Sequence, residues 1–178
     1  DYPAGESGLD LKDWMIGWMK GRTMPKINLD EVPVGSRQGY PEAFRNVTAG
    51  YEQQRVGDAA GLTRMGINRV VLPPRSNTSL MHWHEVDDEF VIVMSGEVVL
   101  CEESGETVLG AGDCAGFKAG VANGHCIQNR GDSPAVLFEI GSRDLEETAH
   151  YPGIDLVYDR RDGQRRFLHL EGTPYEED

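Results

Sequence analysis

Long hydrophobic runs are missing from this sequence. The longest apolar stretches, at residues 14–19 and 90–94, are about six residues or shorter, whereas a membrane-spanning helix needs about 20 residues and a secretory signal needs an apolar segment of about 7–15. The sequence therefore predicts a soluble protein with no membrane partner, located in the cytoplasm.

Basic residues are also scarce. The chain has 17 lysines and arginines against 30 aspartates and glutamates, which gives a formal net charge of −13. An acid excess spread along the chain repels the phosphates of nucleic acids and the surface of anionic lipids. We therefore expect neither nucleic acid nor a membrane surface as a partner.

Cysteine is limited to Cys101, Cys114 and Cys126, an odd number with no CxxC pair. This excludes a disulfide framework that uses every cysteine and a zinc knuckle built from paired thiolates. A reducing compartment, again the cytoplasm, fits this cysteine usage.

Short apolar runs rich in valine and isoleucine lie between glycines and prolines, of which the chain has 22 and 9. This pattern predicts strands joined by tight turns. The 89–94 and 97–101 runs are so close that we expect them to form a hairpin. Strands this dense, with no long helix between them, predict an all-β jelly-roll barrel. The expected strands are 67–72, 89–94, 97–101, 107–109, 114–117, 125–129 and 135–140.

The two ends of the chain differ from this central region. Apolar residues spaced by three and four predict a short amphipathic helix at 9–20, within an N-terminal extension over residues 1–23. We expect residues 24–178 to form a single domain with a core barrel at about 67–142. Its C-terminal part, 143–178, is predicted to wrap the barrel or a partner subunit as strands or coil.

Two histidines flank Trp83 at the end of a probable strand. Side chains alternate along a strand, so His82 and His84 project to the same face. Glu89 begins the next strand after a four-residue turn. This returning strand can bring the carboxylate of Glu89 beside the two rings. A third histidine, His125, lies in a later predicted strand. Two imidazoles on one face, with a carboxylate beside them, are typical of a metal site.

The two histidines, Glu89 and a later glycine are separated by the fixed spacings of a known motif. The stretch His82-x-His84-x4-Glu89-x6-Gly96 resembles the first motif of the cupin superfamily. The resemblance covers roughly residues 67–142 and implies a double-stranded β-helix barrel.

A second stretch, Gly112-x5-Lys118-x-Gly120-x4-His125-x3-Asn129, resembles the second cupin motif. Lys118 stands where this motif usually has proline, and the gap before His125 is two residues longer than usual. These differences affect the turn and leave the histidine in place.

The resemblance implies one divalent metal ion held by His82, His84, Glu89 and His125. Three neutral imidazoles and one carboxylate suit Zn, Mn, Fe, Co or Ni, with positions left for water or substrate. It also implies a small-molecule substrate and a homodimer, because small cupins often pair through outer sheets and terminal segments. No catalytic residue besides these ligands is singled out.

The sequence around the motifs, notably DEFVIVMSGEVVL and AGDCAGFKAGVANGH, is similar to the sequences of a group of small bacterial cupins labelled sugar-phosphate isomerases. The leading interpretation is a metal-dependent enzyme acting on a small oxygen-rich metabolite, such as a sugar phosphate. Two alternatives stay open: an Fe(II)-dependent dioxygenase, and a noncatalytic module that binds a metabolite.

A phosphorylated substrate needs arginine or lysine near the barrel mouth to offset its charge. The candidates from the sequence are Arg64, Arg69, Arg75 and Lys118.

Overall fold

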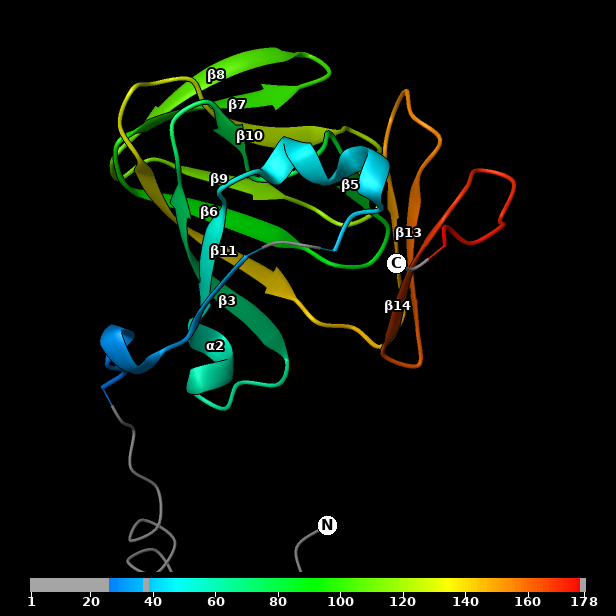
Figure 1. Cartoon of the computed structure of the whole chain (residues 1–178), viewed down its shortest axis with the longest axis horizontal. Helices are drawn as coiled ribbons and strands as arrows, with labels where there is room; N and C mark the ends of the chain where they lie inside the picture. The colour runs from blue at the N-terminus through cyan, green and yellow to red at the C-terminus, as the bar shows by residue number, and fades with distance from the viewer. Residues whose placement is uncertain (1–25, 37–38, 177–178) are drawn as a thin grey trace, which may run out of the picture.

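The computed structural model describes residues 26–36 and 39–176 of the chain (Figure 1). Strands dominate this part, and the helical segments are short: the 3₁₀ helices η1 (Leu29–Glu31) and η2 (Glu42–Thr48), and α2 (Val56–Ala59). The helix predicted at residues 9–20 lies outside the described residues. The strands are β1 (Val34–Ser36), β2 (Glu52–Arg55), β3 (Met65–Leu72), β4 (Ser76–Asn77), β5 (Trp83–His84), β6 (Glu89–Ser95), β7 (Glu97–Glu102), β8 (Gly105–Gly110), β9 (Cys114–Phe117), β10 (His125–Asn129), β11 (Ala135–Ser142), β12 (Glu147–His150), β13 (Val157–Arg161) and β14 (Gln164–Leu168).

Two antiparallel sheets form the barrel. One has the order β1-β2-β3-β11-β6-β9, and the other has the order β4-β10-β7-β8. The buried side chains of Val70, Val93 and Leu137 come from the first sheet, and those of Leu100 and Ile127 come from the second. Because these residues form one hydrophobic cluster, the core lies between the two sheets. The predicted all-β jelly-roll fold is confirmed.

The hairpin predicted for β6 and β7 is wrong, although both strands are present. Strand β6 pairs with β11 and β9, whereas β7 pairs with β10 and β8. The chain crosses from one sheet to the other at Gly96, whose φ of +83° favours glycine. A Cβ at Gly96 would also lie only 2.9 Å from Cα of Ala135. The short connection is therefore a corner of the barrel.

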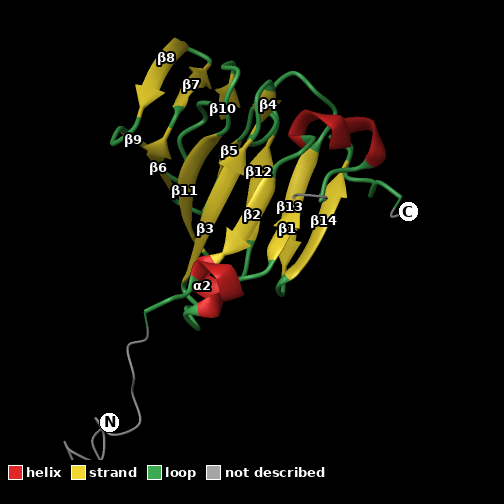
Figure 2. Ribbon diagram, turned by 60° about the vertical axis from the view of Figure 1, so that its left-hand side comes forward, coloured by secondary structure: helices red, strands yellow, loops and turns green. Residues whose placement is uncertain are grey.

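The C-terminal part of the chain forms a third sheet with the order β14-β13-β12-β5 (Figure 2). The connection between β12 and β13 contributes Tyr151 and Leu156 to a second hydrophobic cluster, which includes Tyr40 and has Phe44 of η2 packed against it. The tail predicted as strands or coil is thus a sheet joined to the barrel, since β12 pairs with β5. Among the described helices, none is long and apolar enough to span a bilayer.

We expect Leu137→Ala to lower the free energy of unfolding by about 2–5 kcal/mol, because it leaves a cavity between the sheets. Leu137 is fully buried, whereas Leu145 is 75% exposed. Leu145→Ala is the matched control and should change this free energy by less than about 0.5 kcal/mol. Urea denaturation measures both variants, and equal effects would contradict the assigned core.

Candidate metal centre

The two histidines around Trp83 come from the short strand β5 and the residue before it. The backbones of His82 and His125 form an isolated antiparallel bridge, with N–H···O distances of 3.1 and 2.9 Å. Trp83 lies on the opposite face of the strand from His82 and His84 and stacks on His150 of β12, with ring centroids 4.3 Å apart. Strand alternation and this bridge together place the rings of His82, His84 and His125 close to one another, as the spacing predicts.

The carboxylate of Glu89 lies close to all three imidazole rings. Its Oε2 lies 3.0 Å from Nε2 of His125, 3.5 Å from Nε2 of His84 and 3.6 Å from Nε2 of His82. Ligand atoms of His82, His84 and Glu89 all lie within 4.8 Å of one another. The structure therefore brings together all four residues singled out from the sequence, three imidazole nitrogens around one carboxylate oxygen.

Contacts behind the rings set the direction in which their nitrogens point. Nδ1 of His82 lies 2.9 Å from the carbonyl oxygen of Leu80, which can only accept, so Nδ1 donates and Nε2 is the nitrogen directed at Glu89. His125 is held by stacking on Phe117, with ring centroids 3.5 Å apart. Such contacts behind a histidine are what fixes the ring of a metal ligand.

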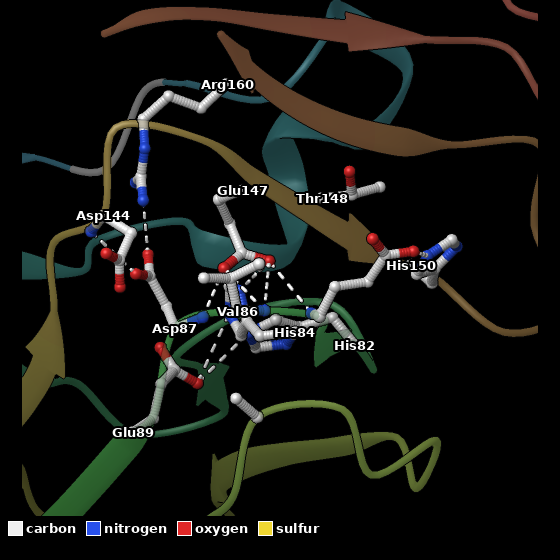
Figure 3. Close-up of polar contacts among 12 residues, drawn as sticks. His82, His84, Val86, Asp87, Glu89, Asp144, Glu147, Thr148, His150 and Arg160 are labelled. Carbon is white, nitrogen blue, oxygen red and sulfur yellow. Dashed lines mark hydrogen bonds and ion pairs between the residues drawn. The ribbon is translucent and has the colours of Figure 1, made fainter. Parts of the chain in front are cut away.

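His84 is oriented by a residue that the sequence analysis missed, Glu147 on β12. Oε1 of Glu147 lies 3.5 Å from Nδ1 of His84. The Glu147 side chain is fully buried and accepts hydrogen bonds from the backbone N–H groups of Glu85, Val86 and Asp87 (Figure 3). An isolated buried carboxylate is costly, and these donors offset that cost. Glu147 therefore holds both the turn before Glu89 and the ring of His84.

The pKa shifts follow from the same contacts. Burial by itself raises the pKa of Glu89, but His125 and His82 outweigh it and hold the pKa well below its usual range. Burial lowers the pKa of His125. Burial also lowers the pKa of His84, but Glu147 and Glu89 outweigh it and raise this pKa. Near neutral pH, Glu89 is therefore ionised and His125 is neutral, the forms in which these side chains bind metals.

The donor set fits a divalent metal ion. Within the part of the chain that the structure describes, Nε2 of His84 is buried and makes no hydrogen bond. Nε2 of His82 lies 3.6 Å from Oε2 of Glu89, beyond hydrogen-bond distance. Buried nitrogens without a hydrogen-bond donor are unusual unless another group binds them. His82, His84, Glu89 and His125 could therefore hold one ion.

A cavity of about 760 Å³ opens at these four residues and extends beneath the C-terminal sheet. Four of its arginines are paired with carboxylates, as in the 2.6 Å contact of Arg160 with the buried Asp87. Arg165 on β14 is exposed and has no ion pair with another described residue. The arginines that line the cavity are Arg45, Arg55, Arg143, Arg160, Arg165 and Arg166.

None of the basic residues chosen from the sequence is among the described residues that line this cavity. Arg69 donates to Gln54, and Arg75 pairs with the exposed Asp132. The cavity arginines lie far from the histidine motifs in the sequence, several of them in the C-terminal tail, so motif spacing could not identify them.

Comparison with known proteins assigns the family. The family model named Cupin domain matches residues 68–141. A solved structure from Silicibacter pomeroyi, described as a sugar phosphate isomerase from a cupin superfamily, is 38% identical over 86% of this chain and 98% of its own, with a TM-score of 0.82. The chain belongs to the cupin superfamily.

Two more solved structures extend this comparison. A candidate sugar phosphate isomerase from Acidithiobacillus ferrooxidans is 27% identical, with a TM-score of 0.64, over 72% of this chain and 81% of its own. A predicted oxalate decarboxylase from Thermotoga maritima shares the fold, at 19% identity and a TM-score of 0.53, over 66% of this chain and 98% of its own. A search of curated proteins found no match.

We expect Glu147→Gln to weaken binding of Mn²⁺ or Zn²⁺ about 10- to 100-fold, because an amide cannot hold both His84 and the backbone donors as the carboxylate does. Isothermal titration calorimetry measures the affinity. The neighbouring Glu146 is exposed, so Glu146→Gln is the control and should bind like the wild type. An unchanged affinity in Glu147→Gln would refute the orienting role of Glu147.

Proposed function

We propose that this cupin is a metal-dependent isomerase that acts on a small phosphorylated sugar. The observation that carries the proposal is the convergence of three imidazole nitrogens on one carboxylate oxygen, at distances of 3.0–3.6 Å, at the edge of a cavity of about 760 Å³. A cavity of this size accepts a metabolite of a few dozen atoms or fewer.

In this proposal His82, His84, Glu89 and His125 hold one divalent ion, with Zn, Mn, Fe, Co and Ni all compatible with the donors. When bound, the ion supplies a Lewis acid that polarises a carbonyl or hydroxyl oxygen of the substrate. Glu147 keeps His84 in place, and the C-terminal sheet covers one side of the cavity.

The substrate class is supported by two independent features. The relatives from Silicibacter pomeroyi and Acidithiobacillus ferrooxidans are both described as sugar phosphate isomerases, the second as a candidate. Arg165 adds to the cavity a guanidinium that has no ion pair with another described residue, in a chain whose formal net charge is −13. A guanidinium matches the geometry of a phosphate group and can bind two of its oxygens.

We expect His84→Ala to lose both the bound metal and isomerisation of sugar phosphates, because one ligand is removed from the set. Elemental analysis of the purified protein and an NMR assay on a panel of aldose phosphates measure the two properties. His150→Gln is the control, since His150 pairs with Glu85 outside the cavity. A metal-free variant that still isomerises would overturn the proposal, and iron with oxygen uptake would favour a dioxygenase instead.

We expect Arg165→Gln to raise KM for a phosphorylated sugar about tenfold, with kcat and metal content unchanged, because a charged hydrogen bond to phosphate is worth about 1.5–3 kcal/mol. Steady-state kinetics measure the change. Arg75→Gln removes an exposed arginine outside the cavity and should leave KM unchanged. Equal KM values for Arg165→Gln and the wild type would exclude Arg165 from phosphate binding.

The proposal also covers the domain, the oligomeric state and the cellular location of the protein. We propose that residues 24–178 form one domain, that two chains form a homodimer, and that the protein is cytoplasmic. The exposed apolar side chains of Val34 and Met94 offer surface for a contact between two copies.

A further inference from the structure

Glu139 is a carboxylate inside the barrel. Its neighbour two residues earlier on β11, Leu137, belongs to the hydrophobic core, and alternate residues of a strand share a face. Glu139 pairs with Asn68 of β3 on one side and with Val91 of β6 on the other. Both Asn68 and Glu139 line the cavity that contains the histidine cluster. The Glu139 side chain therefore faces the cavity from the wall of the barrel.

The next inward-facing position on β11, toward the mouth, is Gly141. It pairs with Glu89 of β6 and with Gly66 of β3. A Cβ added to Gly141 would lie 3.9 Å from Cγ of Glu89, so the two inward faces are adjacent. Glu89 and Glu139 are thus diagonal neighbours on paired strands, roughly 7–8 Å apart at the backbone. These glycines add no side chain to the wall, and the guanidinium of Arg143 lies over Gly66, where a Cβ would come within 3.2 Å of its Nε.

Tyr51 fixes the position of Glu139. Its hydroxyl donates a hydrogen bond of 2.8 Å to Oε2 of Glu139, and its ring, only 1% exposed, packs in the core. A rigid donor at the end of a buried ring holds the carboxylate in one orientation. The core below Glu139 is apolar, and a carboxylate at this depth carries a desolvation cost that packing alone does not require.

We infer that Glu139 is the catalytic residue that moves the proton between the two carbons of the substrate, and that Tyr51 is its positioning residue. The inference rests on the proposed function and adds a residue to it. Because Glu139 and the histidine cluster line one cavity, a substrate whose carbonyl oxygen lies at the cluster can present its neighbouring carbon to Glu139. General acid–base groups must lie within hydrogen-bond reach of the proton that they move.

The step balances without an oxidant or reductant. The Glu139 carboxylate takes the proton from the carbon next to the carbonyl, and the electron pair of that C–H bond forms the C=C bond of an enediolate. The carbonyl π pair moves to its oxygen. Glu139 then returns the proton to the former carbonyl carbon, while the proton of the neighbouring hydroxyl passes to the former carbonyl oxygen. An aldose becomes a ketose, and Glu139 ends as a carboxylate.

The test compares Glu139→Gln with the wild type on a panel of aldose phosphates in D₂O, by NMR. We expect isomerisation and deuterium incorporation at carbon to fall together, by about 100-fold or more, with metal content unchanged and KM within about threefold. Glu52→Gln is the control, because Glu52 is exposed and lies outside the cavity. It should match the wild type.

Tyr51→Phe separates positioning from packing, because it removes only the hydroxyl. We expect kcat to fall with KM and metal content unchanged, and Glu139→Gln with Tyr51→Phe to be no slower than Glu139→Gln alone, since the two residues act as one unit. Glu139→Asp keeps the charge and serves if Glu139→Gln does not fold by circular dichroism. It should lower kcat by shortening the reach of the carboxylate.

The outcomes distinguish the two claims. Wild-type rates in Glu139→Gln, or in Glu139→Asp where that variant is used, overturn the role of Glu139 and leave the proposed function standing. Loss of bound metal from the Glu139 variant makes the residue part of the metal site and also overturns its role. A wild-type protein that neither isomerises nor exchanges a carbon-bound proton with any member of the panel overturns both.

Discussion

The buried carboxylate of Glu147 is the constraint on which the candidate site depends. It accepts the backbone N–H groups of three consecutive residues, Glu85 to Asp87, and contacts the ring of His84. These residues form the turn between the histidine pair and Glu89. Turns are usually the more mobile parts of a fold, and here a carboxylate with no exposed surface holds one. The positions of His84 and Glu89 therefore depend on β12, a strand outside the two cupin motifs.

A second buried pair strengthens the same turn. Asp87 accepts hydrogen bonds from the hydroxyl of Ser142 and the backbone of Asp144, and pairs with Arg160 at 2.6 Å. Removing one partner of such a pair leaves an uncompensated buried charge, which costs more than the pair contributes. Asp87, Glu147 and Arg160 thus make the turn, the barrel strand β11 and the C-terminal sheet interdependent.

The sequence predicted the parts of this structure that depend on local pattern. Strands β3 and β6–β11 follow from short apolar runs rich in valine and isoleucine between turns. The convergence of His82, His84 and Glu89 follows from strand alternation across one turn. The predicted hairpin of β6 and β7 was wrong because proximity in the chain does not decide which sheet a strand joins. The φ of +83° at Gly96 makes that connection a corner.

Long-range contacts could not be predicted in this way. Glu147, Glu139 and Arg165 lie outside the histidine motifs. Strand pairing brings Glu139 and Arg165 to the cavity and Glu147 to the ring of His84. Glu147 begins β12 beside Glu146 and Thr148, so no local pattern marked it as a buried carboxylate. The pairing of β12 with β5 gives the tail a role that composition did not indicate. One strand order, β14-β13-β12-β5, joins the histidine segment to residues 147–168. The region matched by the family model, residues 68–141, therefore lacks the strand that carries Glu147, and a protein cut to that region would lose the contact that orients His84.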